Sequence, residues 1–270
     1  MKEETLIPET KPDYFAIKRL SNSAMKYFKL SPMHYLHYIS DSEKKVTTAM
    51  VFGSAFHCMI LEAEKFDDCF AMLPQLDRRT NAGKDAARIF EQENIGKQII
   101  TADEHATLIE MQTKIFAHEP SMELLNQVKE AEKEVLWSDK ITGIELKGKL
   151  DGLGNNFILD LKTCQSAQPN QFAVHAFDYD YHRQAALYVD GCAANSIPAN
   201  NFYFIAIEKE PPYGISVNRA SEAFVENGRK DYQQILENFR YWKELGEPNV
   251  GYEFNSPFNQ FDIQLPAWVK

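Results

Sequence analysis

The sequence has few cysteines, no long apolar run and no excess of positive charge. Its four cysteines, Cys58, Cys69, Cys164 and Cys192, form no C-x-x-C pair, so neither a structural zinc site nor a cysteine-held iron–sulfur cluster is expected. No apolar run approaches the roughly 18 residues that span a bilayer, which argues against a membrane protein. The first residues also lack the apolar core of a signal peptide. The expected location is therefore the cytoplasm.

Positive charge is in deficit. The chain has 39 Asp and Glu against 29 Lys and Arg, a net charge of −10. A polyanionic ligand favours a basic protein, so this charge argues against a tight, non-catalytic DNA-binding module. The objection is weaker for a metal enzyme, because carboxylates that bind metal count as negative in the sum but are neutralised by the ion. Local clusters of Lys and Arg also matter more than the total.

Composition and patterning predict one globular domain with mixed secondary structure. Hydrophobic residues make up 44% and charged residues 25% of the 270 positions, enough for a substantial core. Residues 1–16 are expected to form a flexible arm and residues 17–270 a single domain. The patterns predict helices at 24–30, 32–38, 48–66, 85–94, 101–117, 120–127, 169–175, 179–194 and 221–245, and strands at 132–139, 143–151, 157–163, 201–208 and 214–218. This order predicts an α/β or mixed α+β fold, with a central mixed sheet flanked by helices and an N-terminal helical part.

Two neighbouring predicted strands carry a pair of carboxylates and an ammonium. Asp151 ends the first strand, Asp160 and Lys162 share one face of the second, and residues 154–156 between them are typical of a turn. Clustered carboxylates bind a hard divalent cation, and a lysine beside them can orient water or offset charge on a phosphate. This set favours metal-assisted phosphodiester hydrolysis. An exposed hairpin of ordinary polar residues is an equally open interpretation at this point.

His57 is a candidate ligand on a predicted helix. Apolar residues surround most of the girth of helix 48–66, which indicates burial. A histidine in such a place is more often a satisfied core residue than a ligand. Gly53, one turn earlier, would allow another backbone or a metal to approach that face closely.

Helix 179–194 carries a stripe of polar and aromatic residues. Gln184 and Tyr188 share one face of the helix, and Tyr181 joins them one turn earlier. Such a stripe is usually core or interface. It could also hold a nucleotide through amide hydrogen bonds and ring contact.

Four motifs occur along the chain in the order G-x-x-x-H, G-x-x-D, D-x-K-T and Q-x-x-x-Y. This order resembles the PD-(D/E)xK nuclease superfamily, in the branch typified by the RecB nuclease domain, over residues 20–208. Residues 20–26 and 78–84 are similar to the RecE-type exonucleases, the exonuclease VIII family, including stand-alone phage or prophage versions. The resemblance implies a restriction-endonuclease-like core.

The resemblance assigns a role to each of these residues. His57, Asp151 and Asp160 match the family's metal ligands, with the backbone carbonyl of Leu161 as a further ligand. Lys162 matches the catalytic lysine. Ligation requires a neutral imidazole, so activity should fall as His57 becomes protonated below its reference pKa of about 6.5.

Further positions of the family pattern surround these ligands. Gln184 and Tyr188 match its fourth motif, whose residues have a supporting role near the active site and the bound DNA. The pattern also has an acidic residue on the strand before G-x-x-D, where Glu134 is slightly favoured over Glu132. Iron–sulfur relatives have a cysteine where the first helix ends. Here Ser31 stands there and no cysteine follows position 192, so no cluster is expected.

A basic segment is a candidate DNA contact. Arg78, Arg79, Thr80 and Lys84 could bind phosphates, with the Gly83 backbone helping. A solvated loop with no ligand is an equally open interpretation.

The resemblance implies a Mg²⁺- or Mn²⁺-dependent exonuclease that degrades linear double-stranded DNA from the 5′ end and leaves 3′ single-stranded tails for recombination. Its expected partners are double-stranded DNA ends, a RecT-like single-strand annealing protein and further copies of itself in a ring. Two alternatives stay open: a non-catalytic DNA- or partner-binding protein on a nuclease-like fold, and a repair endonuclease of the same superfamily.

Overall fold

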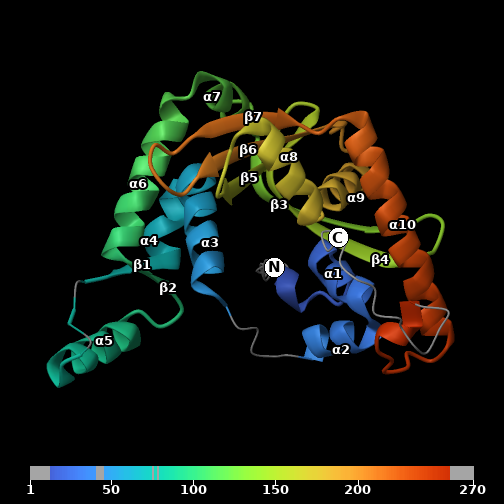
Figure 1. Cartoon of the computed structure of the whole chain (residues 1–270), viewed down its shortest axis with the longest axis horizontal. Coiled ribbons are helices and arrows are strands. Elements are labelled where there is room, and N and C mark those ends of the chain that lie inside the picture. Colours follow the sequence, from blue (N-terminus) through green and yellow to red (C-terminus); the bar gives the residue numbers. More distant parts are fainter. Residues whose placement is uncertain (1–12, 41–45, 75, 78, 256–270) are drawn as a thin grey trace, which may run out of the picture.

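The computed structural model describes residues 13–40, 46–74, 76–77 and 79–255 (Figure 1). Its helices are α1 (Asn22–Leu30), α2 (Pro32–Ser40), α3 (Thr48–Leu61), α4 (Phe66–Cys69), α5 (Asn81–Glu93), α6 (Ala102–Ala117), α7 (Glu119–Leu125), α8 (Pro169–Asp178), α9 (Tyr181–Ala194) and α10 (Glu222–Glu244). Its strands are β1 (Phe70–Leu73), β2 (Gln98–Thr101), β3 (Glu130–Ser138), β4 (Glu145–Leu153), β5 (Phe157–Cys164), β6 (Asn201–Glu208) and β7 (Ile215–Arg219). Short 3-10 turns lie at Tyr14–Ala16, Ala63–Lys65 and Tyr252–Asn255.

Five strands form a central mixed sheet in the order β3-β4-β5-β6-β7. Strands β5 and β6 are parallel, and the other neighbours are antiparallel. Helices α8 and α9 connect the parallel pair, as such a crossover requires. The predicted mixed α/β fold with a central sheet flanked by helices is confirmed.

Polar side chains and proline set the starts of several helices. The Ser21 hydroxyl accepts a hydrogen bond from the Ala24 N–H and caps α1. A reciprocal capping box joins Thr101 and Glu104 at the start of α6. Pro169 occupies the first turn of α8, where its missing N–H is not needed. These local signals are readable in the sequence, which explains why most helices were predicted close to their observed bounds.

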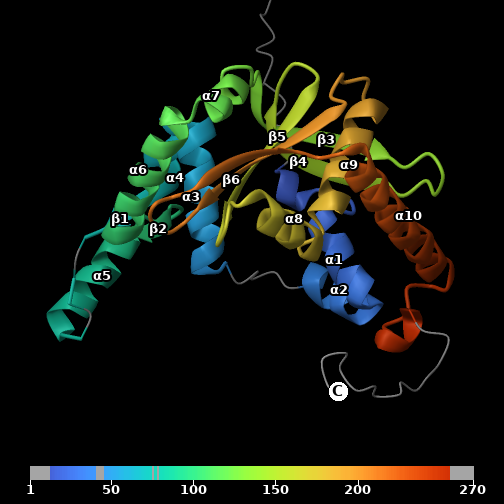
Figure 2. The same cartoon turned by 45° about the horizontal axis from the view of Figure 1, so that its top comes forward.

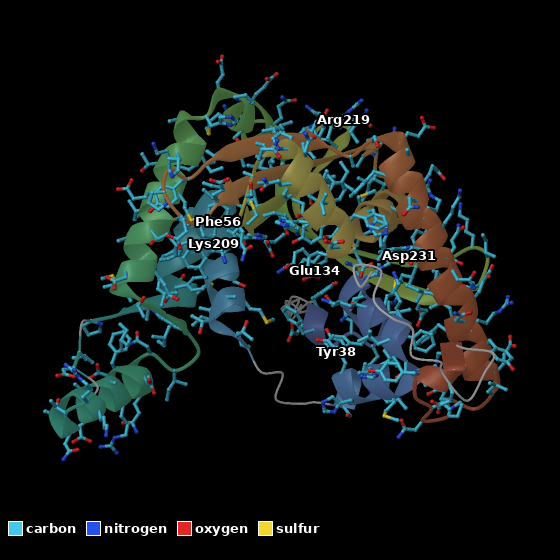
Figure 3. All side chains as sticks on the ribbon, viewed as in Figure 1. Tyr38, Phe56, Glu134, Lys209, Arg219 and Asp231 are labelled. Carbon is cyan, nitrogen blue, oxygen red and sulfur yellow. The ribbon has the colours of Figure 1, made fainter. Side chains whose placement is uncertain are left out.

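The sheet is buried on both faces. One face packs against α3 and α6 in a core that contains Phe56, Leu159 and Leu161. The opposite face packs against α1, α9 and α10 in a second core that contains Ile158. Figure 3 places Phe56 of α3 and Asp231 of α10 on either side of the molecule. Because β5 is covered on both faces, its polar side chains lie inside the protein.

The structure corrects three sequence predictions. Strands β1 and β2 form a separate two-stranded parallel sheet that was not predicted, because four residues are too few to show alternation. The helix predicted at 48–66 ends at Leu61, since Glu62 leaves the helical conformation (φ −142°, ψ 48°). That helix is also less buried than expected: Met50, in its first turn, is 56% exposed.

The first described residues contact β4 along the part of it that β5 leaves unpaired. The ammonium of Lys147 in β4 donates to the carbonyl oxygens of Tyr14 and Ile17, both at 2.8 Å. Leu20 then forms an isolated parallel bridge with Leu146. Most of the expected arm, residues 1–12, lies outside the described residues. Within the part of the chain that is described, no helix is both long and apolar enough to cross a membrane.

Candidate active site

The candidate site lies where β4 and β5 stop pairing. The two strands pair beside their turn, Gly152 with Leu159 and Leu153 with Ile158. Further along β5, β4 no longer pairs with Leu161, and two side chains contact the Leu161 backbone instead. Its N–H donates to Asp151 Oδ2 at 2.9 Å, and its carbonyl oxygen lies 2.9 Å from Nε2 of His57.

His57 connects α3 to both strands. Its Nδ1 lies 3.4 Å from Asp151 Oδ2, while its Nε2 contacts the Leu161 carbonyl. Burial alone would lower the pKa of this histidine, but the Asp151 carboxylate outweighs that effect and raises the pKa above its ordinary value. In the metal-free protein the imidazole is therefore more readily protonated than a free histidine.

Glu132 completes a group that could hold a metal ion. One ligand atom each of His57, Glu132 and Asp151 lies within 4.8 Å of the others. Two carboxylate oxygens and an imidazole nitrogen form a donor set that suits a divalent cation. The Glu132 carboxylate also pairs with Lys149 at 2.5 Å. Glu132 has a φ of 52°, a left-handed conformation that is uncommon for residues other than glycine.

Strand register explains why this group contains Glu132. Ala131 pairs with Gly152 and Lys133 with Leu150, so Glu132 lies across from Asp151. Glu134, which the sequence pattern slightly favoured, pairs with Lys149, is exposed and is not part of the group. The sequence shows both acidic residues, but only the pairing of β3 with β4 decides between them.

Asp160 and Lys162 form a buried ion pair on the α9 side of β5. Asp160 is only 1% exposed, and its Oδ2 accepts a hydrogen bond from Gln184 Nε2 at 2.6 Å. Burial raises the pKa of Asp160 to about 6; the Asp151 charge acts in the same direction and the Lys162 ammonium opposes it. Burial would lower the pKa of Lys162, but Asp160 and Asp151 raise it overall, so this lysine stays charged. The exposed-hairpin interpretation is therefore wrong.

Helix α9 packs closely against the side of the sheet that carries Asp160 and Lys162. A Cβ atom on Gly148 would lie 2.9 Å from the ring of Tyr188, so the glycine of G-x-x-D allows α9 to approach β4. Gln184, one turn earlier on the same helix, fixes the Asp160 carboxylate. Burial raises the pKa of Tyr188 well above its usual value, so this phenol is neutral. Both residues of α9 thus hold the strands of the site in place, Gln184 through Asp160 of β5 and Tyr188 through its contact with Gly148 of β4.

One family model matches most of the chain. A family model for a "PDDEXK-like domain of unknown function (DUF3799)" matches residues 21–250, most of the chain. The chain belongs to this family. Its fold is that of the PD-(D/E)xK nuclease superfamily. Among proteins of curated function, none matches the chain.

Solved structures match this chain at low sequence identity. The crystal structure of a candidate exonuclease from Eubacterium rectale is 14% identical and has a TM-score of 0.59, and the match covers 91% of each chain. LHK-Exo, solved in complex with dAMP, is 12% identical with a TM-score of 0.28, over 71% of this chain and 91% of that one. The first of these likenesses supports the fold assignment.

Gly53 was expected to let another part of the backbone approach the face of α3 that carries His57. Among the described residues, no atom lies within 4 Å of the position that a Cβ on Gly53 would take. No neighbouring backbone in the described part of the chain therefore uses this glycine for a close approach. His57 is instead placed by α3 as a whole, because Phe56 beside it is fully buried against the sheet.

The basic segment is not brought to the site. Arg78 lies outside the described residues. Arg79 pairs with Asp77 at 3.0 Å, and Thr80 caps α5 by accepting the Gly83 N–H at 3.0 Å. Lys84 lies in the first turn of α5, which begins at Asn81 and so starts four residues before the helix predicted at 85–94. Figures 1 and 2 show α5 projecting away from β4 and β5.

Proposed function

We propose that the protein is a metal-dependent nuclease that hydrolyses phosphodiester bonds in DNA. The observation that carries this proposal is the meeting of two groups at the gap between β4 and β5. His57, Glu132 and Asp151 form the cluster that could hold a metal ion, and the Asp160–Lys162 ion pair lies close enough for the Asp151 carboxylate to raise the pKa of both its members. Family membership supports the same conclusion.

The site residues divide the chemical work. His57, Glu132 and Asp151 would hold the metal, with Asp160 and the Leu161 carbonyl as the further ligands that the resemblance assigns. A divalent ion bound there would act as a Lewis acid on the scissile phosphate and favour deprotonation of water. Lys162, held as an ammonium, would orient the attacking water and offset the charge that develops on phosphate oxygens. Gln184 would keep the Asp160 carboxylate in one orientation.

The finer proposal is a RecE-type exonuclease. It would use Mg²⁺, or Mn²⁺, and degrade linear double-stranded DNA from the 5′ end to leave 3′ single-stranded tails for recombination. The similarity of residues 20–26 and 78–84 to that family supports it, within the superfamily that the order of the four motifs indicates. A ring of copies around DNA and a RecT-like annealing partner belong to the same proposal.

One assay separates the proposal from its alternatives. Linear and closed circular DNA are incubated with the protein in Mg²⁺ and in EDTA. We expect Mg²⁺-dependent loss of the linear form only. Loss of circles would identify an endonuclease, and DNA binding without loss of either form would identify a non-catalytic binding protein. The same assay on Asp151→Asn, which lacks a proposed metal ligand, should show no cleavage. Its matched control is Glu237→Gln, which changes an exposed carboxylate on α10 and should cleave like wild type.

A further inference from the structure

A row of aromatic rings runs from the surface to the ammonium of Lys162. The Lys162 Nζ lies 4.6 Å from the centre of the Tyr181 ring. The Tyr179 ring stacks on Tyr181 at 5.9 Å between centroids and 28° between planes. Tyr179 is 61% exposed. The exposed ring of Tyr179 is therefore separated from Lys162, the proposed catalytic lysine, by the ring of Tyr181 alone.

The inner ring of this row is firmly held. Tyr181 stacks on Phe204 at 5.9 Å and 27° and contacts Phe172 at 6.5 Å. Both phenylalanines are buried, Phe172 in α8 and Phe204 in β6. The Tyr179 ring thus rests on a support that belongs to the hydrophobic core. An aromatic side chain that is both exposed and firmly supported is suited to stacking against a planar ligand.

The charges around Tyr179 favour a base over a phosphate. Asp178 beside it is exposed, and Asp180 follows directly, already paired with Lys29 and Arg183. The exposed Asp178 carboxylate repels a phosphate group but not the neutral face of a base. At the inner end of the row, Lys162 offers the positive charge that a phosphate needs. A nucleotide would therefore lie with its phosphate at Lys162 and its base at Tyr179.

We propose that Tyr179, supported by Tyr181, is a stacking platform for an unpaired base of the DNA strand held in the active site. The inference rests on the proposed nuclease function and narrows its substrate. A base inside a duplex has both faces covered by its neighbours, so the platform selects a nucleotide at a strand end or in a single strand. Stacking of this kind is tolerant of sequence, because every base has a π face.

The test measures binding without cleavage. Dissociation constants of the full chain are measured in Ca²⁺ by fluorescence anisotropy, for a labelled oligothymidine and for an abasic strand of equal length. The platform predicts that Tyr179→Ala raises the oligothymidine dissociation constant about tenfold or more and leaves the abasic one unchanged. Tyr179→Phe keeps the ring and should bind like wild type. Tyr241→Ala is the matched control, since Tyr241 on α10 is 56% exposed.

Two results would overturn the platform. One is a wild-type protein that binds oligothymidine no better than the abasic strand. The other is a Tyr179→Ala variant that weakens both ligands equally or neither. The nuclease function fails in a different way: the wild type would discriminate between the strands in Ca²⁺ and still not degrade DNA in Mg²⁺.

Discussion

The carbonyl oxygen of Leu161 lies 2.9 Å from Nε2 of His57, across 104 positions of sequence. This contact joins the helix that carries the histidine to the central strand of the sheet. Leu161 uses its N–H for Asp151 in the same way. Three of the proposed ligand positions therefore converge on Leu161, which pairs with β6 on one side but has no partner in β4 on the other. The site exists only once α3, β4 and β5 are in place.

Replacement of Asp160 should destabilise the protein as well as inactivate it. The residue is buried and paired with Lys162, so Asp160→Ala leaves a buried ammonium without its nearest partner. We expect a loss of about 3–5 kcal/mol in the free energy of unfolding, measured by urea denaturation. The double variant Asp160→Asn with Lys162→Met removes both charges and should recover part of that loss. No difference between the two variants would contradict the ion pair.

Gln184 should act through Asp160. Gln184→Leu removes the 2.6 Å hydrogen bond to the carboxylate while keeping a similar volume, and we expect metal affinity or turnover to fall about 10–100-fold. Gln184→Glu places a second carboxylate beside Asp160 and should raise the pKa of that residue further, which moves the acidic limb of the pH–rate profile upward. An unshifted profile in Gln184→Glu would show that the two side chains do not interact.

Gly148 should be intolerant of any side chain. Gly148→Ala introduces a Cβ 2.9 Å from the Tyr188 ring, and the overlap should lower the free energy of unfolding by about 1–3 kcal/mol. Gly53→Ala is the matched control, since its Cβ meets no described atom within 4 Å. Thermal unfolding of both variants measures the difference. Equal behaviour would mean that α9 does not need its close approach to β4.

Metal binding should release protons and strengthen with rising pH. The Asp151 carboxylate raises the pKa of His57 above its usual 6.5, so a larger fraction of this imidazole is protonated near neutral pH and must lose its proton to become a ligand. The dissociation constant for Mn²⁺ should therefore fall as pH rises from about 6 to 8. Calorimetry in buffers of different ionisation enthalpy counts the protons. His57→Gln should flatten this dependence, and a wild type with no proton release would contradict the assignment.

Local patterns of the sequence were sufficient for the main architecture. Alternation along residues 157–163 predicted β5, and the i, i+4 spacing of Gln184 and Tyr188 placed both on one face of α9. The burial of Asp160 was not predictable, because alternation cannot tell that a second layer of helices covers the polar face. Glu132 could not be chosen over Glu134 without the register of β3 on β4. Both failures concern contacts between elements, which the pattern within one element does not contain.

The most direct test of the central claim is cleavage of end-labelled linear duplex DNA by three proteins: wild type, Lys162→Met and Lys114→Met. Lys114 is an exposed lysine on α6 and serves as the matched control, and circular dichroism shows that each variant is folded at the assay temperature. The account predicts Mg²⁺-dependent cleavage by wild type and Lys114→Met, and a loss of at least about 100-fold in Lys162→Met. Cleavage that persists in a folded Lys162→Met variant, or a wild type that is inactive with Mg²⁺ and Mn²⁺, would contradict it.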